Sequence, residues 1–199
     1  MLISNATTIF FDFDGVIKDS VRVKSEAFEK LFSSFGDKAS KKVRRHHESN
    51  GGMSRFEKIP IYLEWVNLPS TPIVVGKFSN EFSKLVMQKV IDSEWVPGVL
   101  NFIENNYKIK NLFIVTATPQ SEIEEIINRI GIAKCFKKII GSPTNKSDAV
   151  SSIVDKFNIN INKSIMIGDS ITDHKAATDN NISFILRKTP LNYHLQNKL

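Results

Sequence analysis

The chain has 199 residues, which suits one domain of ordinary size or a core domain with a modest insertion. Hydrophobic residues make up 41% of it and no run of about eighteen apolar residues occurs, so we exclude a membrane span and expect a water-soluble globular protein. The first residues carry no secretory signal, and the single cysteine, Cys135, cannot form an internal disulfide, so we expect a cytoplasmic protein.

The chain carries a net charge of +6, and much of the positive excess lies between residues 21 and 60, including the run KKVRR at Lys41–Arg45. A basic face of this kind can bind nucleic-acid phosphates, but no aromatic platform, zinc finger or recognition-helix signature accompanies it. We therefore expect no nucleic acid partner, and we favour a solvated helix face that attracts small anionic substrates.

The first predicted strand is Thr7–Phe11, a short β-rich run of the kind that is buried inside a parallel sheet. Residues 20–94 then follow helical spacing and contain no convincing strand. Turn-forming residues at Gly51-Gly52 and at positions 68–72 divide this stretch into about four helices. The sequence therefore predicts a helical insertion directly after the first strand.

From residue 97 onward, predicted strands alternate with predicted helices. The helices begin near Pro97, Pro119, Asn145 or Ser147, and Ile171. The strands are Asn111–Thr116, Lys137–Gly141, Ser164–Gly168 and Ser183–Arg187. This alternation predicts an α/β fold with a parallel sheet that has helices on both faces. Residues 188–199 carry no strong pattern.

Polar residues follow the first four predicted strands, at the sheet edge where the ligand crevice of an open parallel sheet lies. They are Asp12, Asp14, Thr116, Lys146, Asp169 and Asp173. Several carboxylates in one partly dry crevice repel one another unless a cation lies among them. Because no cysteine or histidine cluster accompanies these acids, they favour Mg²⁺ over zinc or iron. The hydroxyl of Thr116 and the ammonium of Lys146 suit the oxygens of a phosphoryl group.

The spacing of Asp12 and Asp14 suits phosphoryl transfer. We expect Asp12 to act as nucleophile and metal ligand. Asp14, two residues further on, is expected to protonate the ester oxygen as general acid and then to take a proton from water as base. Gly15 allows the chain to turn sharply away from the strand.

In chain order, these residues resemble the four motifs of the haloacid dehalogenase superfamily. The matching stretches are Asp12-x-Asp14-Gly15-Val16 with Asp19-Ser20, then Thr116, then Lys146, then Gly168-Asp169-Ser170-x-x-Asp173. The resemblance runs from about Thr7 to Arg187, and it is closest to the branch of phosphoglycolate phosphatase and β-phosphoglucomutase. It implies a Rossmann-like core formed by residues 1–19 and 95–199, with an α-helical cap formed by residues 20–94.

The resemblance also implies roles for single residues. It implies a phospho-aspartyl intermediate on Asp12, and phosphate binding by Thr116, Ala117 and Lys146. The metal ligands that it implies are the Asp12 carboxylate, the Asp14 backbone carbonyl, Asp169, and Asp173 either close by or through water. Lys146 departs from the branch, because Ser147 follows it where proline is usual.

The predicted cap adds one clue. The stretch Gly51–Lys58 is similar to the Gly-x-Ser-Arg stretch of the β-phosphoglucomutase cap, which implies that Arg55, beside Ser54, meets a substrate phosphate. The alternative is that Ser54 caps a helix and Arg55 lies at the surface. Four further polar residues of the cap are expected at the surface rather than as ligands, with a place near the substrate as the alternative for each: His46, His47, Glu48 and Lys58.

Together these residues indicate a Mg²⁺-dependent phosphatase that hydrolyses a small phosphate monoester, such as a sugar phosphate, through a phospho-aspartyl intermediate. A phosphomutase of the β-phosphoglucomutase type is the first alternative, for which the stretch around Arg55 is the only hint. The second alternative is a domain that binds phosphorylated ligands without turning them over. The natural substrate lies beyond the sequence, because cap side chains rather than the motifs would select it.

Overall fold

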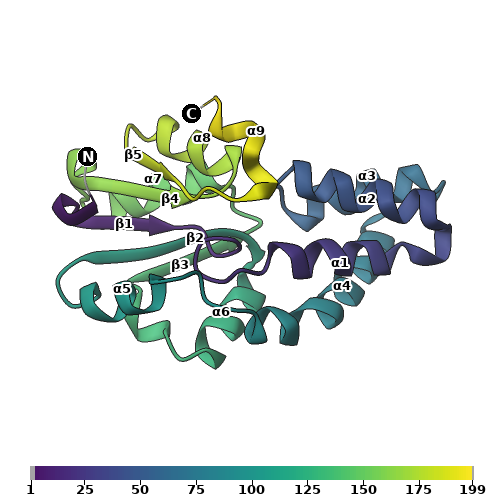
Figure 1. Ribbon diagram of the computed structural model, residues 1–199, viewed down its shortest axis with the longest axis horizontal. Coiled ribbons are helices and arrows are strands. Elements are labelled where there is room, and N and C mark those ends of the chain that lie inside the picture. The colour runs from purple at the N-terminus through teal and green to yellow at the C-terminus, as the bar shows by residue number, and fades with distance from the viewer. Residues whose placement is uncertain (1–2, 199) are drawn as a thin grey trace.

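The protein, described by a computed structural model for residues 3–198, is built on a five-stranded sheet in the order β3-β2-β1-β4-β5 (Figure 1). All neighbouring strands pair in parallel. The strands are Thr8–Phe11 (β1), Asn111–Pro119 (β2), Lys138–Ser142 (β3), Ser164–Gly168 (β4) and Ser183–Leu186 (β5). The prediction of an α/β, Rossmann-like parallel sheet is confirmed.

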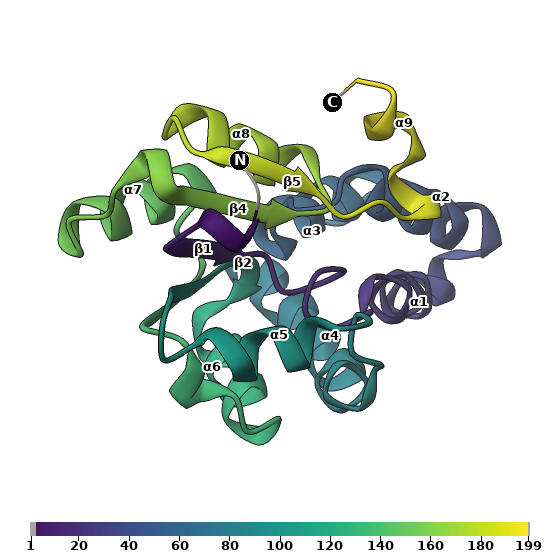
Figure 2. The same cartoon turned by 60° about the vertical axis from the view of Figure 1, so that its left-hand side comes forward.

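Helices cover both faces of the sheet, and Figure 2 shows one pair on each side. They are α5 (Val99–Asn106) and α6 (Gln120–Arg129) on one face, and α7 (Lys146–Lys156) and α8 (Ile171–Asp179) on the other. Successive strand side chains point to opposite faces. Phe11 and Ile114 therefore pack on the α6 side, whereas Phe10 and Phe113 pack with Val150 of α7 on the other. Burial on both faces explains why these strands are almost entirely apolar.

Four helices lie between β1 and β2 in the chain and form a second body beside the sheet, on the right of Figure 1. They are α1 (Val21–Leu31), α2 (Asp37–Ser49), α3 (Arg55–Trp65) and α4 (Pro72–Asp92), here called the helical insertion. Its interior is aromatic: the rings of Phe28 and Phe82 lie 3.9 Å apart between centroids, and Tyr62 meets Phe28 edge to face. The helical periodicity of this stretch is confirmed.

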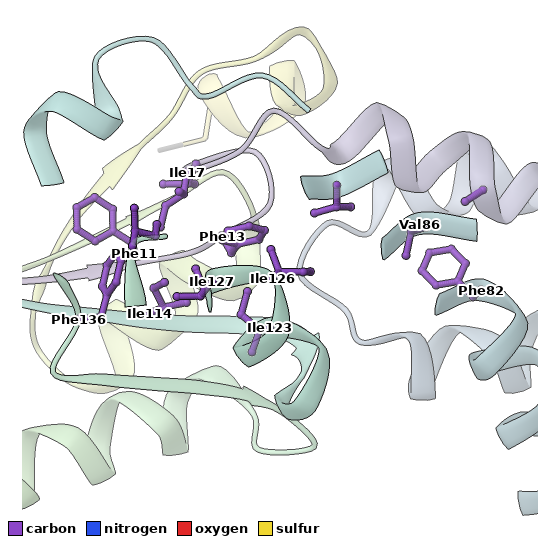
Figure 3. Packing of buried hydrophobic residues seen from close by; sticks show 14 of the residues in the cluster. Phe11, Phe13, Ile17, Phe82, Val86, Ile114, Ile123, Ile126, Ile127 and Phe136 are labelled. Atoms are coloured by element: carbon purple, nitrogen blue, oxygen red, sulfur yellow. The ribbon is translucent and has the colours of Figure 1, made fainter. Parts of the chain in front are cut away.

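One hydrophobic cluster continues from the sheet into the helical insertion. Figure 3 shows Phe11 and Ile114 of the sheet, Ile123 of α6, and Phe82 and Val86 of α4 within it. Buried apolar contacts therefore link the sheet to the helical insertion. The boundary between these two bodies is called the seam below. Across residues 3–198, none of the helices has both the length and the apolar composition needed to cross a bilayer.

The remaining elements are short. They are the 3₁₀ turns Ile3–Asn5 (η1), Ser33–Phe35 (η2), Ala133–Cys135 (η3), Ile161–Lys163 (η4) and Pro190–Asn192 (η5), and the helix Tyr193–Gln196 (α9). The last two form a C-terminal segment, residues 189–196, which runs from the sheet toward the helical insertion (Figure 1). Turn η5 contacts α2. The sequence carried no signal for this segment.

Candidate active site

A cavity of about 90 Å³ lies at the seam, between the carboxyl ends of the strands and the helical insertion. The sheet side contributes Asp12, Asp14, Thr116, Ala117 and Asp169 to its lining. The strand order explains this convergence, because β1 lies between β2 and β4 and all three strands end at the same edge. Sequence reasoning expected these residues to meet, and the structure brings them together.

Three carboxylates form the centre of the site. Oxygens of Asp12, Asp169 and Asp173 lie within 4.8 Å of one another. Phe11 pairs with Ile167 across β1 and β4, so the residues that follow these strands leave the sheet side by side. Burial, reinforced by the charge of Asp173, raises the pKa of Asp12 to about 7, and burial likewise raises the pKa of Asp169 well above its ordinary value.

This cluster fits a hard divalent cation. The donor atoms are all carboxylate oxygens, which Mg²⁺ prefers. Like charges this close raise one another's pKa, and a cation among them would remove that penalty. The turn of Gly15 supports the arrangement: its φ is +75°, and a Cβ there would lie 2.2 Å from Oδ2 of Asp169. Only glycine lets the backbone pass so close to this carboxylate.

Lys146 joins two of the three carboxylates. Its Nζ lies 2.9 Å from Oδ2 of Asp12 and donates a hydrogen bond of 2.6 Å to Oδ1 of Asp173. Burial alone would lower the pKa of Lys146, but the two carboxylates raise it. The other oxygen of Asp173 accepts hydrogen bonds from the backbone N–H and hydroxyl of Ser170. Both oxygens of Asp173 are therefore already engaged.

Asp14 is held by residues that sequence reasoning did not single out as partners. Its carboxylate accepts hydrogen bonds from Ser20 at 2.6 Å and Thr118 at 2.9 Å, and forms an ion pair with Lys24. Burial alone would raise the pKa of Asp14, but Lys24 and the two hydroxyls hold it below its ordinary value. Asp14 is thus ionised, which suits a base. Spacing could have indicated Lys24, which lies one helical turn after Ser20.

The structure places Thr118, whose hydroxyl is hydrogen-bonded to Asp14 and Lys24, close to Thr116. Thr116 and Thr118 are both buried near the end of β2, where its register with β3 shifts. The backbone N–H of Thr118 donates a hydrogen bond of 3.2 Å to the hydroxyl of Thr116. Ala117 lies between them on the cavity wall.

Arg55 is buried, so the alternative of a surface arginine is wrong, although the helix cap at Ser54 that belonged to it is confirmed. Its guanidinium donates two hydrogen bonds to Glu122 of α6, at 2.9 and 2.5 Å, and a third to Ser83 of α4 at 2.6 Å. Arg55 lines the cavity, but its donors are turned to this ion pair, and its contact with substrate stays a prediction. Ser54 caps α3 in a capping box with Glu57.

His47 and Lys58 are not surface residues, and this prediction is wrong. They are 8% and 2% exposed, because the inner faces of α2 and α3 turn them into the cavity. Nζ of Lys58 and Nδ1 of His47 lie 2.9 Å apart. His46 is half-buried against Tyr62, and Glu48 is half-buried with its carboxylate on Arg44.

The C-terminal segment closes another part of the cavity, with Leu191 and His194 in the lining. Nδ2 of Asn192 donates a hydrogen bond of 2.8 Å to the backbone carbonyl of Asp169 and another to that of Arg187. Asn192 therefore fixes the loop that carries one of the central carboxylates. No periodicity or motif in the sequence marks this role.

The sequence and the fold are similar to those of known proteins. The chain is 25% identical over 177 residues to a phosphorylated carbohydrates phosphatase of Thermotoga maritima, covering 85% of this chain and 79% of that protein. The fold is similar to that of a haloacid dehalogenase-like hydrolase from Streptococcus pneumoniae, with a TM-score of 0.69, 20% identity, and coverage of 92% of this chain and 85% of that one.

A second similar structure is that of CbbY from Rhodobacter sphaeroides, solved in complex with xylulose-1,5-bisphosphate. It has a TM-score of 0.74 at 15% identity and covers 95% of this chain and 89% of that one. The sequence model of haloacid dehalogenase-like hydrolases matches residues 9–186, nearly the whole chain. The protein therefore belongs to the haloacid dehalogenase-like hydrolase family.

Proposed function

We propose that this protein is a Mg²⁺-dependent phosphatase that hydrolyses a small phosphate monoester through a phospho-Asp12 intermediate. The observation that carries the proposal is the convergence of Asp12 and Asp169 on the lining of one small cavity, with Lys146 paired to Asp12. A sugar phosphate is the favoured substrate class. The relative from Thermotoga maritima, named for phosphorylated carbohydrates, and the sugar bisphosphate bound by CbbY support that class.

Mg²⁺ would be held by the carboxylates of Asp12 and Asp169 and the backbone carbonyl of Asp14. Asp173 would act through water, because both of its oxygens already accept hydrogen bonds. When bound, the ion supplies positive charge that keeps Asp12 ionised and offsets the charge of the phosphate. Thr116, the backbone of Ala117 and Lys146 would hold the phosphate oxygens.

In the first step, an oxygen of Asp12 attacks phosphorus. A bond forms between them while the ester P–O bond breaks, and the leaving oxygen takes a proton from Asp14. This step needs a proton on Asp14, so its ion pair with Lys24 must loosen when substrate binds. The leaving alcohol then departs.

In the second step, water attacks the phosphorus of phospho-Asp12 and gives a proton to the Asp14 carboxylate. The P–O bond to Asp12 breaks, inorganic phosphate leaves, and the Asp12 carboxylate is restored. The proton on Asp14 is then ready for the next cycle. The helical insertion would act as the cap, excluding bulk water from the seam.

The test is phosphate release from p-nitrophenyl phosphate with Mg²⁺. Asp12→Asn should lower kcat by about 1,000-fold or more, because the amide is a poor nucleophile. Removal of Mg²⁺ with a chelator should have a similar effect. The control is Asp155→Asn, which changes an exposed carboxylate of α7 and should leave the rate unchanged.

Other results would identify the alternatives. Slow phosphate release with activation by a sugar bisphosphate and isomerisation of a sugar phosphate would identify a phosphomutase. Tight binding of phosphate esters without release would identify a binding domain. Full activity in Asp12→Asn would contradict the phospho-Asp12 mechanism.

A further inference from the structure

The cavity is lined by three buried cationic side chains from the helical insertion, and they differ in what neutralises them. Lys24 forms an ion pair with Asp14, and Arg55 forms one with Glu122. Within residues 3–198, no carboxylate lies within 4.0 Å of the ammonium of Lys58. Lys58 is therefore the lining cation whose counter-ion is missing from the described chain.

This arrangement is costly for the protein alone. Lys58 is 2% exposed. A buried ammonium loses its hydration, and without a nearby anion no ion pair offsets that loss. Burial lowers its pKa to about 7, and the nearby charges of Lys24 and Lys146 act in the same direction. Asp14 and, on the same helix, Glu57 act the other way without overcoming burial.

The contact with His47 orients Lys58 without neutralising it. Burial, with the charges of Lys58 and Lys24, lowers the pKa of His47 well below its ordinary value, so the ring is neutral. Nδ1 of His47 can then accept a hydrogen bond from one of the three N–H groups of the ammonium, with 2.9 Å between Nζ and Nδ1. His47 is itself fixed against the ring of Phe28, at 4.9 Å between centroids. The other N–H bonds of Lys58 remain for a ligand in the cavity.

We propose that Lys58, oriented by His47, forms an anion subsite for a second negatively charged group of the substrate. The substrate would then be a small phosphate monoester whose alcohol carries a carboxylate or a second phosphate. The scissile phosphate binds at Asp12, and the second anion supplies the charge that Lys58 lacks. Phe28 and Phe82 line the cavity and would flank the carbon chain between the two groups. This inference rests on the proposed phosphatase function.

The first experiment compares, in the wild-type enzyme with Mg²⁺, pairs of substrates that share a carbon chain and differ in one anionic group. One arm uses 3-phosphoglycerate against glycerol 3-phosphate, and the other uses propane-1,3-diol bisphosphate against its monophosphate. We expect kcat/KM to favour the anionic member of at least one pair by about tenfold or more, as for a desolvated charge pair. The arm that shows the preference distinguishes a carboxylate from a phosphate.

The second experiment repeats the favoured pair with Lys58→Met. The preference should fall to near one, mainly through a higher KM for the anionic member. The matched control is Lys84→Met, an exposed lysine of α4 whose loss should leave the preference unchanged. Equal kcat/KM within both pairs in the wild type, or a preference that survives in Lys58→Met, would overturn the proposal.

A binding measurement keeps the proposal testable if Lys58→Met does not fold. In the Asp12→Asn protein, calorimetry with Mg²⁺ should give a dissociation constant about tenfold lower for the anionic member of the favoured pair. Equal constants would overturn the subsite. Failure of the phosphatase proposal is distinguishable, because then no ester, p-nitrophenyl phosphate included, would release phosphate.

Discussion

The buried ammonium of Lys58 makes the stability of the fold depend on pH. Its pKa is about 7 in the folded protein, against an ordinary value of 10.5. Between these values the unfolded chain binds more protons, so the free energy of unfolding rises with pH across this window. Below about pH 7 both states bind the proton, and the penalty for burying the charge is fully present.

Lys58→Met should therefore be more stable than the wild type at pH 6, and its advantage should shrink as the pH approaches 10. Urea unfolding of both proteins at pH 6, 8 and 9.5 measures the difference between their free energies of unfolding. The contributions of the other titrating groups are the same in both proteins and cancel in this difference. A stability difference that is the same at all three pH values would show that Lys58 keeps its ordinary pKa in the folded state.

At this scale the sequence predicted the aspartates better than the residues of the helical insertion. Asp12 and Asp169 follow strands, and the ends of parallel strands converge whatever the details of packing. Lys58 and His47 lie on helices, where the direction of a side chain depends on how each helix is rotated against its neighbours. The spacing from Arg55 to Lys58, about one helical turn, was the available hint that both face the same way.

Among the helices, the contact between α3 and α6 depends on one buried ion pair. The side chains of Arg55 and Glu122 are 4% and 5% exposed. Their ion pair joins the helical insertion to α6, a helix that packs on the sheet. Glu122→Ala would leave the guanidinium buried without its partner. We expect the free energy of unfolding to fall by about 3–5 kcal/mol.

Replacing both partners separates this effect from simple loss of packing. The double variant Arg55→Met with Glu122→Leu should be less destabilised than Glu122→Ala, because no unpaired charge remains. Glu125→Ala, an exposed position on the same helix, should change stability by less than about 0.5 kcal/mol. Denaturant unfolding of the single variants Arg55→Met and Glu122→Leu, beside the double variant and the wild type, measures the coupling. A double variant as unstable as the sum of its single changes would show that the pair does not interact.

Elements with a strong hydrophobic period were predictable, and those held by polar contacts were not. All five strands lie close to their predicted positions, and the stretch predicted to be helical forms four helices, because burial imposes a period of two or of 3.6 residues on these sequences. The C-terminal segment is fixed instead by the side-chain amide of Asn192, which donates hydrogen bonds to the backbone carbonyls of Asp169 and Arg187. A single hydrogen-bonding side chain leaves no pattern along the chain.

For the molecule as a whole, the continuous hydrophobic cluster predicts that sheet and helical insertion unfold together. Phe11 of strand β1 and Phe82 of the helical insertion belong to the same buried cluster (Figure 3). Differential scanning calorimetry should therefore give one transition, with equal calorimetric and van't Hoff enthalpies. Two resolved transitions would mean that the insertion is an independent folding unit.

The position of the C-terminal segment also bears on how the protein can be handled. Residues 189–196 lie against the cavity, whereas the chain enters β1 from η1, at the sheet edge remote from it (Figure 1). An affinity tag, fluorophore or surface linker attached after this segment would pull on Asn192, the residue that anchors the Asp169 loop. Attachment at the amino end would place such additions near the amino ends of the strands, away from the cavity. Binding and rate measurements are therefore best made on amino-terminally tagged protein.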